Sequence, residues 1–196
     1  MVIKMTDKSV KTFLDELASN APAPGGGSVA ALSGALGAGL ISMVCNLTLG
    51  KPKYTAVEND ISAILKKSES LREELTDLIQ ADIKAYIELN HTMKMPRDTD
   101  EQKAVRTKAM DKALKAATDV PMKVAEACVS VMALCPDTAA KGNSNALSDV
   151  GVGILMAEAG LRSAALNVLI NLGLTKDEHF VMEIRQKLDA LLKGKP

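Results

Sequence analysis

The sequence predicts an all-α protein, an up-and-down bundle of long antiparallel helices in a single domain, residues 1–196. Two observations support this fold class. A heptad-like apolar stripe continues through residues 57–89, which is typical of a long helix packed in a bundle. No run of alternating apolar and polar residues indicates a strand.

The first two predicted helices flank a glycine-rich turn. Apolar residues at i, i+3, i+4 and i+7 predict a helix that ends near Asn20, namely Val10, Phe13, Leu14 and Leu17. The segment PAPGGG at 22–27 follows, which is a turn because clustered Pro and Gly interrupt both helices and strands. Ser28 is the expected N-cap of a second helix that reaches about Leu49, with Gly50 at its C-terminal end.

Two further helices are predicted on either side of Pro96. The stripe at 57–89 forms the third helix, which Pro96 ends. Thr99 and Gln102 have the spacing of a capping box and open a fourth helix, which continues to Asp119. Pro121 then either kinks this helix or begins a fifth one at its first position.

The C-terminal third is predicted to contain two more helices. Pro136 breaks or bends the helix that follows Pro121, and residues 142–145 form a loop. A largely apolar helix is expected over 147–172. Thr175 and Glu178 then give a second capping box before an amphipathic last helix.

Composition excludes several classes of function. Lys and Arg balance Asp and Glu at 24 each, aromatic residues make up 2%, and Trp is absent, which argues against a nucleic-acid partner. The two histidines and three cysteines lack the spacing of metal ligands, so no metal site is expected. An odd number of cysteines in apolar sequence, with no apolar signal segment after Met1, predicts a cytoplasmic protein.

Residues 21–50 carry no charge and are long enough to span a bilayer. Small residues four apart run through the segment, as in Ala30/Gly34 and Ser33/Gly37, and they allow helices to approach closely in water as well as in lipid. The flanking segments are amphipathic. We therefore expect the central helix of a soluble bundle and no membrane partner.

The three glycines Gly25, Gly26 and Gly27, followed by Ser28, form the first candidate binding element. They lack the Lys-Ser/Thr ending of a nucleotide P-loop, and no strand precedes them. Free backbone N–H groups at a helix N-terminus attract anions and polar ligand edges. The alternative is that the glycines only permit a tight corner between helices.

Asp82 is the candidate catalytic residue. It occupies a core position of the stripe at 57–89, where a hydrophobic residue is expected, and Ser68 interrupts the same stripe. A carboxylate there is costly unless it is paired, hydrogen-bonded or open to a cavity. Asp82 either pairs with a lysine or caps another helix, or it has a perturbed pKa and transfers protons in a cavity.

Asn143, Asn145 and Asp149 form a second polar cluster before the apolar helix at 147–172. These residue types are ordinary caps, and they are equally suited to hydrogen-bond a ligand edge. Lys51 and Lys53 follow the second helix and suit its negative end, or they attract an anionic substrate tail. Glu158 and Arg162, four residues apart, are expected to form an ion pair rather than a catalytic unit.

Three segments carry a resemblance to a known family. These are APAPGGGSVAALSGALGAGLISMVCNLTLGKPKY, the DIKAY element from Asp82 to Tyr86, and GNSNALSDVGVGILMAEAGLRSAALNVLINL. Together they resemble the formimidoyltetrahydrofolate cyclodeaminase family, which includes stand-alone methenyltetrahydrofolate cyclohydrolases. The segment DTDEQKAVRTKAMDKALKAATDVP is similar to the stand-alone branch.

The resemblance implies a helical homodimer that binds folate in a cleft near the subunit interface. It implies that Asp82 is the catalytic aspartate, and that the glycine turn, Tyr86 and residues 143–149 line the folate site. The expected reaction is hydrolysis of 5,10-methenyltetrahydrofolate to 10-formyltetrahydrofolate, with no cofactor beyond the folate itself. The alternatives are cyclodeamination of 5-formiminotetrahydrofolate and a non-catalytic dimer that only binds folate.

Overall fold

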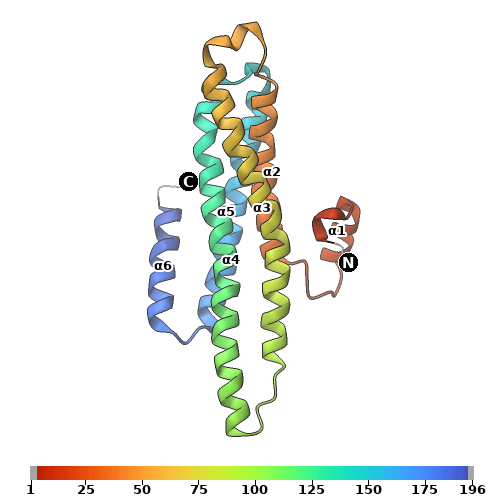
Figure 1. Ribbon diagram of the computed structural model, residues 1–196, viewed down its shortest axis with the longest axis vertical. Coiled ribbons are helices and arrows are strands. Elements are labelled where there is room, and N and C mark those ends of the chain that lie inside the picture. Colours follow the sequence, from red (N-terminus) through yellow and green to blue (C-terminus); the bar gives the residue numbers. More distant parts are fainter. Residues whose placement is uncertain (1–3, 194–196) are drawn as a thin grey trace.

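Four long helices form the bundle, and they run up and down in chain order (Figure 1). The computed structural model describes residues 4–193, and within that range it contains no strand, which confirms the all-α prediction. Consecutive helices are antiparallel neighbours because the connections between them are short. The four helices are α2 (Gly26–Asn46), α3 (Glu58–Met93), α4 (Asp100–Lys141) and α5 (Leu147–Leu174).

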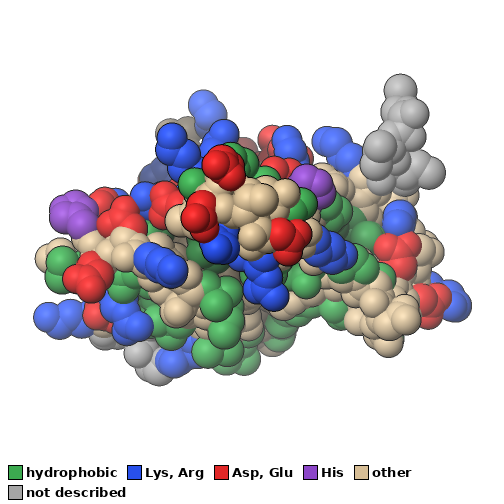
Figure 2. All heavy atoms as spheres, turned by 90° about the horizontal axis from the view of Figure 1, so that it is seen from below, with side chains coloured by type: hydrophobic (Ala, Val, Ile, Leu, Met, Phe, Trp, Pro, Cys, Tyr) green, Lys and Arg blue, Asp and Glu red, His purple; other side chains and the backbone are tan. Residues whose placement is uncertain are grey.

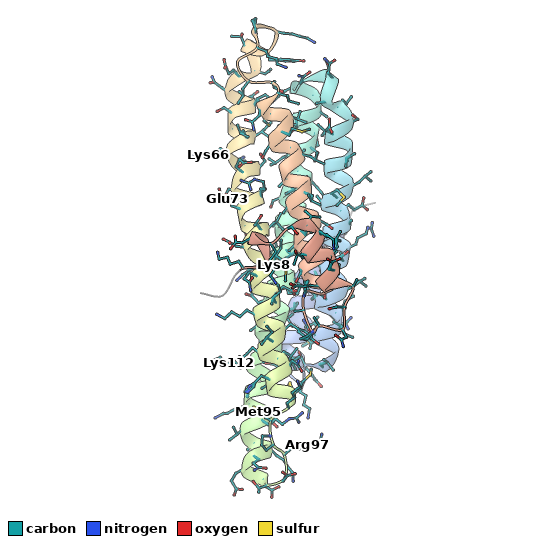
Figure 3. The ribbon with its side chains drawn as sticks, turned by 90° about the vertical axis from the view of Figure 1, so that its right-hand side faces the viewer. Lys8, Lys66, Glu73, Met95, Arg97 and Lys112 are labelled. Atoms are coloured by element: carbon teal, nitrogen blue, oxygen red, sulfur yellow. The ribbon has the colours of Figure 1, made fainter. Side chains whose placement is uncertain are left out.

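Two shorter helices lie outside the bundle, on opposite sides in Figure 1. They are α1 (Val10–Leu17) and α6 (Glu178–Leu192). Three 3₁₀ turns complete the described chain: η1 (Met5–Asp7), η2 (Pro52–Val57) and η3 (Ser144–Ala146). Figure 3 shows Lys8 before α1 at mid-height of the bundle, and Met95 and Arg97 in the turn from α3 to α4.

The predicted small-residue contacts hold α2 against its neighbours. A Cβ atom added at Gly34 would lie 2.7 Å from the Cys128 Sγ, and one at Gly160 would lie 2.9 Å from the Ala30 carbonyl oxygen. The backbones of α2 and α5 therefore meet at a distance that only glycine allows. This contact explains why residues 21–50 need so few large side chains.

Two helices have the length and apolar composition of a membrane span, Gly26–Asn46 and Ser144–Leu174. Neighbouring helices bury most of the first, which is the environment expected for a core helix of a soluble bundle. Less than half of the second is buried. Its exposed apolar surface therefore needs a separate explanation.

The structure resolves the open question at Pro121 and Pro136. Both lie inside one continuous helix of 42 residues, so Pro121 does not begin a new helix and Pro136 does not end one. A proline cannot donate to the carbonyl four residues earlier. The Ala117 carbonyl, which Pro121 leaves without its helical partner, accepts a 2.8 Å hydrogen bond from Asn171 Nδ2 on α5.

Of the three predicted helix caps, one is confirmed and two are wrong. Thr99 and Gln102 do form the capping box of α4. Ser28 does not cap α2, because the helix begins two residues earlier, with Gly25 as its N-cap, and the Ser28 hydroxyl bonds elsewhere. Asp177, not Thr175, caps α6 and accepts a hydrogen bond from the Phe180 N–H.

Unequal helix lengths create the space for a site. α2 has 21 residues, whereas α3 and α4 have 36 and 42, so the N-terminus of α2 ends partway along the other two (Figure 1). Beyond that point only three long helices, α3, α4 and α5, face one another. The cavity described below lies between these three helices.

Candidate active site

Asp82 belongs to α3, and its side chain lies against the N-terminus of α2, beside the glycine turn. Its Oδ2 accepts a 2.7 Å hydrogen bond from the Ser28 hydroxyl, and Ser28 is fully buried. The Asp82 carboxylate also lies against the backbone of Gly27, so closely that a Cβ atom at Gly27 would collide with it. The glycine turn and Asp82, which are more than 50 residues apart in sequence, therefore form one unit.

The electrostatics of Asp82 are set by burial and not by a neighbouring cation. Burial raises the pKa of the Asp82 carboxyl above its ordinary value, while hydrogen bonds from the hydroxyl and backbone N–H of Ser28 act in the opposite direction. Within residues 4–193 no lysine or arginine pairs with it. The predicted lysine pair is absent there, and the helix-capping alternative is present.

Asp82 opens into a cavity of about 220 Å³ between α3, α4 and α5. Tyr86, one helical turn after Asp82, lines the same cavity and is 45% exposed. Most of the remaining wall is apolar: Ala85, Leu89, Met93, Ala117, Pro121, Ile170 and Leu174. A single carboxyl group in an apolar cavity, held by a neutral hydroxyl, is suited to exchange protons with a bound molecule.

The other predicted binding residues lie at the opposite end of α2. Asn143 donates through Nδ2 to the Leu47 carbonyl at 3.1 Å, and its backbone N–H donates to Thr48 Oγ1 at 2.8 Å. The 21 residues of α2 separate this end from Ser28 by roughly 30 Å at about 1.5 Å per residue. One chain therefore does not bring Asn143 and Asp82 into a single pocket.

A small hydrogen-bonded cluster surrounds Asn143. Its Oδ1 accepts from the backbone N–H of Asn145 at 3.1 Å and lies 3.5 Å from the Tyr54 hydroxyl. Lys53 is exposed, with its Nζ 5.2 Å from the centre of the Tyr54 ring, and Asp149 lies in the first turn of α5. The Asn143 side chain thus fixes the loop to α2, while Lys53 and Asn145 remain open to solvent.

Sequence reasoning missed two residues of the cavity wall, Asn167 and Asn171, which lie one turn apart on α5. Asn167 also lies beside the glycine turn, because a Cβ atom added at Gly26 would lie 3.5 Å from its Nδ2. Both are uncharged, so they do not stand out in a count of charges along an apolar helix. Their i, i+4 spacing on that helix is the signal that identifies them.

Other polar residues singled out in the sequence have structural roles. Ser68 pairs with the Ser42 hydroxyl at 2.8 Å in the buried contact of α3 with α2, away from Asp82. Glu158 and Arg162 form the expected ion pair at 2.8 Å. In the part of the chain that the structure describes, no three His, Cys, Asp or Glu side chains are grouped to hold a metal ion.

Two known proteins with similar sequences have names that match the family suggested by the sequence motifs. The chain is 50% identical to a methenyltetrahydrofolate cyclohydrolase from Methylorubrum extorquens, over 95% of this chain and 89% of that protein. It is 34% identical to a formimidoyltransferase-cyclodeaminase from Rattus norvegicus, over 96% of this chain but only 35% of that longer protein. The chain therefore spans about a third of the length of the bifunctional relative.

A solved structure and a family model agree with these relatives. The crystal structure of formiminotetrahydrofolate cyclodeaminase from Thermotoga maritima superposes with a TM-score of 0.84 at 30% identity, covering 94% of this chain and 88% of that one. The formiminotransferase-cyclodeaminase family model matches residues 9–190. These matches confirm the resemblance seen in the sequence motifs, and the chain belongs to the formiminotransferase-cyclodeaminase family.

Proposed function

We propose that the protein is a methenyltetrahydrofolate cyclohydrolase, which converts 5,10-methenyltetrahydrofolate and water into 10-formyltetrahydrofolate. The observation that carries the proposal is Asp82, a carboxyl group with a raised pKa that faces an apolar cavity and has Ser28 rather than a cation as its partner. The 50% identity to a cyclohydrolase over nearly the whole chain supports the choice of reaction.

The chemistry needs one group that moves protons. The methenyl carbon between two folate nitrogens carries positive charge, so water adds to it without a metal or a second cofactor. Asp82 accepts a proton from that water as general base. It then returns a proton to the departing N5 nitrogen as the adduct collapses to the 10-formyl product. The Ser28 hydrogen bond holds the carboxyl group in place throughout.

Cyclodeamination is the second candidate reaction, and the 30% identity to the Thermotoga maritima enzyme favours it. In that reaction the other folate nitrogen attacks the formimino carbon and ammonia leaves, which requires a general acid. A carboxyl group whose pKa is raised by burial can supply that proton. The cavity beside Asp82 therefore suits either substrate.

Purified protein is tested with both substrates. Loss of the methenyl absorbance from 5,10-methenyltetrahydrofolate, faster than in buffer, is the expected result. Appearance of that absorbance together with ammonia from 5-formiminotetrahydrofolate would instead assign the deaminase reaction. Binding of folate with no turnover of either substrate would make the protein a non-catalytic folate-binding dimer.

We further propose a homodimer, formed through α2 and α5, with the site near the interface. Large hydrophobic side chains are exposed along these two helices: Leu36, Met43, Val152, Leu155, Leu166 and Ile170. Figure 2, which looks along the bundle from below, shows hydrophobic side chains gathered at its lower margin and charged ones above. An apolar face of this kind suits a second copy of the chain.

The two clusters at opposite ends of α2 support the same assembly. If a two-fold axis crosses α2 and α5 near their middle, the partner's helices run antiparallel to those of the first protomer. The Lys53 and Asn143 end of one protomer then approaches the Asp82 end of its partner. Such an arrangement brings all the predicted folate-binding residues together. We also propose a cytoplasmic location, where thiols are kept reduced, because all three cysteines are free and buried.

A further inference from the structure

Asn167 and Asn171 present their side-chain oxygens in a fixed orientation. Asn167 Nδ2 donates to the Ser163 carbonyl at 2.8 Å, and Asn171 Nδ2 donates to the Ala117 carbonyl at 2.8 Å. Each amide nitrogen is therefore bound to backbone. Within residues 4–193 neither Oδ1 atom accepts a hydrogen bond, and both residues line the cavity that contains Asp82.

Pro121 explains why the Asn171 amide is oriented in this way. The Ala117 carbonyl has no helical N–H partner because Pro121 lacks one, and a carbonyl oxygen can accept only from a donor. Nδ2 of Asn171 must therefore face Ala117, and Oδ1 must point away from it. The orientation of this amide follows from chemistry, since the reverse orientation would oppose two acceptors.

Two amide oxygens, in a wall that is apolar apart from Asp82, Tyr86 and these two asparagines, favour a ligand with N–H donors. The tetrahydropterin ring system of a folate has a flat pyrimidinone half and a partly apolar reduced half, and it carries a 2-amino group and ring N–H groups as donors. A recognition site for such a ring needs apolar walls and a few oriented polar atoms, which this cavity provides. Asp82 lines the same cavity.

We propose that Asn167 and Asn171 bind the pterin ring by accepting hydrogen bonds from its N–H groups. Pro121 is then a positioning residue that fixes the orientation of the Asn171 amide. The assignment rests on the proposed function for its ligand, a tetrahydrofolate. It gives Pro121 a functional reason to lie within α4. Its loss of one helical hydrogen bond creates the anchor for the substrate-binding amide.

Two alanine variants test the acceptors. Asn167→Ala and Asn171→Ala should each raise the Kd of 5-formyltetrahydrofolate, a stable ligand with the same ring, roughly tenfold. This is the usual effect of leaving one polar group without its hydrogen-bond partner. KM for 5,10-methenyltetrahydrofolate should rise by a similar factor, with a smaller change in kcat. A Kd and KM equal to those of the wild type in both variants would overturn the proposal.

A double variant separates binding from structure at Asn171. Asn171→Ala leaves the Ala117 carbonyl unpaired and should lower the melting temperature. Pro121→Ala restores the helical N–H, so Pro121→Ala/Asn171→Ala should regain that stability. The Kd should remain raised in the double variant. A Kd that returns to the wild-type value together with the stability would show that Asn171 has only a structural role, and would refute its part in binding.

Pro121→Ala alone tests the positioning role. It releases the Asn171 amide from the Ala117 carbonyl. The melting temperature should therefore stay equal or rise, while the Kd should rise a few-fold because the amide is no longer held in one orientation. An unchanged Kd would remove Pro121 from the proposal.

Since Kd is measured without turnover, wild-type protein that binds folate but catalyses neither reaction would contradict the proposed function alone. Wild-type protein that binds no tetrahydrofolate would overturn both.

Discussion

The Ser28 hydroxyl donates a 2.7 Å hydrogen bond to the Asp82 carboxylate, which joins the first turn of α2 to the C-terminal half of α3. Ser28 is fully buried, and its backbone N–H also acts on the carboxylate from the positive end of α2. A neutral hydroxyl orients the acid without neutralising it. Asp82 therefore remains available to take up and release a proton.

Asp82→Asn should lower turnover by about 10²-fold or more, the usual scale for loss of a general acid–base group. The asparagine oxygen can still accept the Ser28 hydrogen bond, so folate binding and the melting temperature should change little. Asp77→Asn, an exposed carboxylate five residues earlier on α3, is the matched control and should retain full activity. An Asp82→Asn protein that melts early yet turns over normally would reduce Asp82 to a structural role.

Stability should depend on pH through Asp82 in a defined direction. Burial raises its pKa above the ordinary value of 3.8, so the folded state binds this proton more tightly than the unfolded state does. Ionised Asp82 therefore lowers the free energy of unfolding at neutral pH. This effect fades as the pH falls through the raised pKa of the folded state and is lost below 3.8, where both states are mostly protonated.

Urea denaturation of wild type and Asp82→Asn measures this effect. The variant should be at least as stable as the wild type at about pH 7, and its advantage should shrink as the pH is lowered to about 4. A difference that grows in acid would mean that the pKa of Asp82 is lowered in the folded state. The kcat/KM of the wild type should fall in the same acidic range, as the base becomes protonated.

Gly27→Ala should greatly reduce activity, because its Cβ atom would collide with the Asp82 carboxylate and displace it from Ser28. Gly173→Ala is the matched control, since Gly173 is exposed on α5 and a Cβ atom there has no other atom within 4 Å. Steady-state kinetics and thermal melts of both variants distinguish a local displacement from unfolding. Full activity in Gly27→Ala would show that the close packing at this turn is not required.

Lys53→Glu tests whether the second cluster meets the substrate of the partner subunit. If Lys53 contacts the anionic glutamate tail, KM for a polyglutamylated folate should rise more than KM for the monoglutamate, and added salt should reduce the difference. Lys66→Glu, which changes an exposed lysine on α3, controls for a general change of charge. Equal effects on both substrates would exclude Lys53 from tail binding.

Leu155→Glu should dissociate the proposed dimer. Leu155 is 63% exposed on α5, and a carboxylate buried there between two copies would be strongly unfavourable. Met182→Glu on α6, at 64% exposure, is the control and should leave the assembly intact. Light scattering after gel filtration gives the mass of each protein. A monomeric wild type at micromolar concentration would remove the basis for a site shared between subunits.

Much of the fold could be predicted because helical periodicity is local. The stripe at 57–89 predicted α3, and Thr99 with Gln102 predicted the start of α4. The errors at Ser28 and Thr175 arose because several residues near each helix start can cap it, and tertiary contacts decide which one does. At Ser28 the competing partner was Asp82, which is distant in sequence.

The sequence by itself determined that Asp82 is exceptional, since a carboxylate in an apolar stripe contradicts a pattern that is visible without coordinates. Only the tertiary structure decided what Asp82 touches: Ser28, Gly27 and a cavity shared with Asn167 and Asn171. Periodicity fixes which face of a helix is buried, but not which helix covers it or where that helix begins. The start of α2 partway along α3 sets that contact, and it depends on packing between residues far apart in the chain.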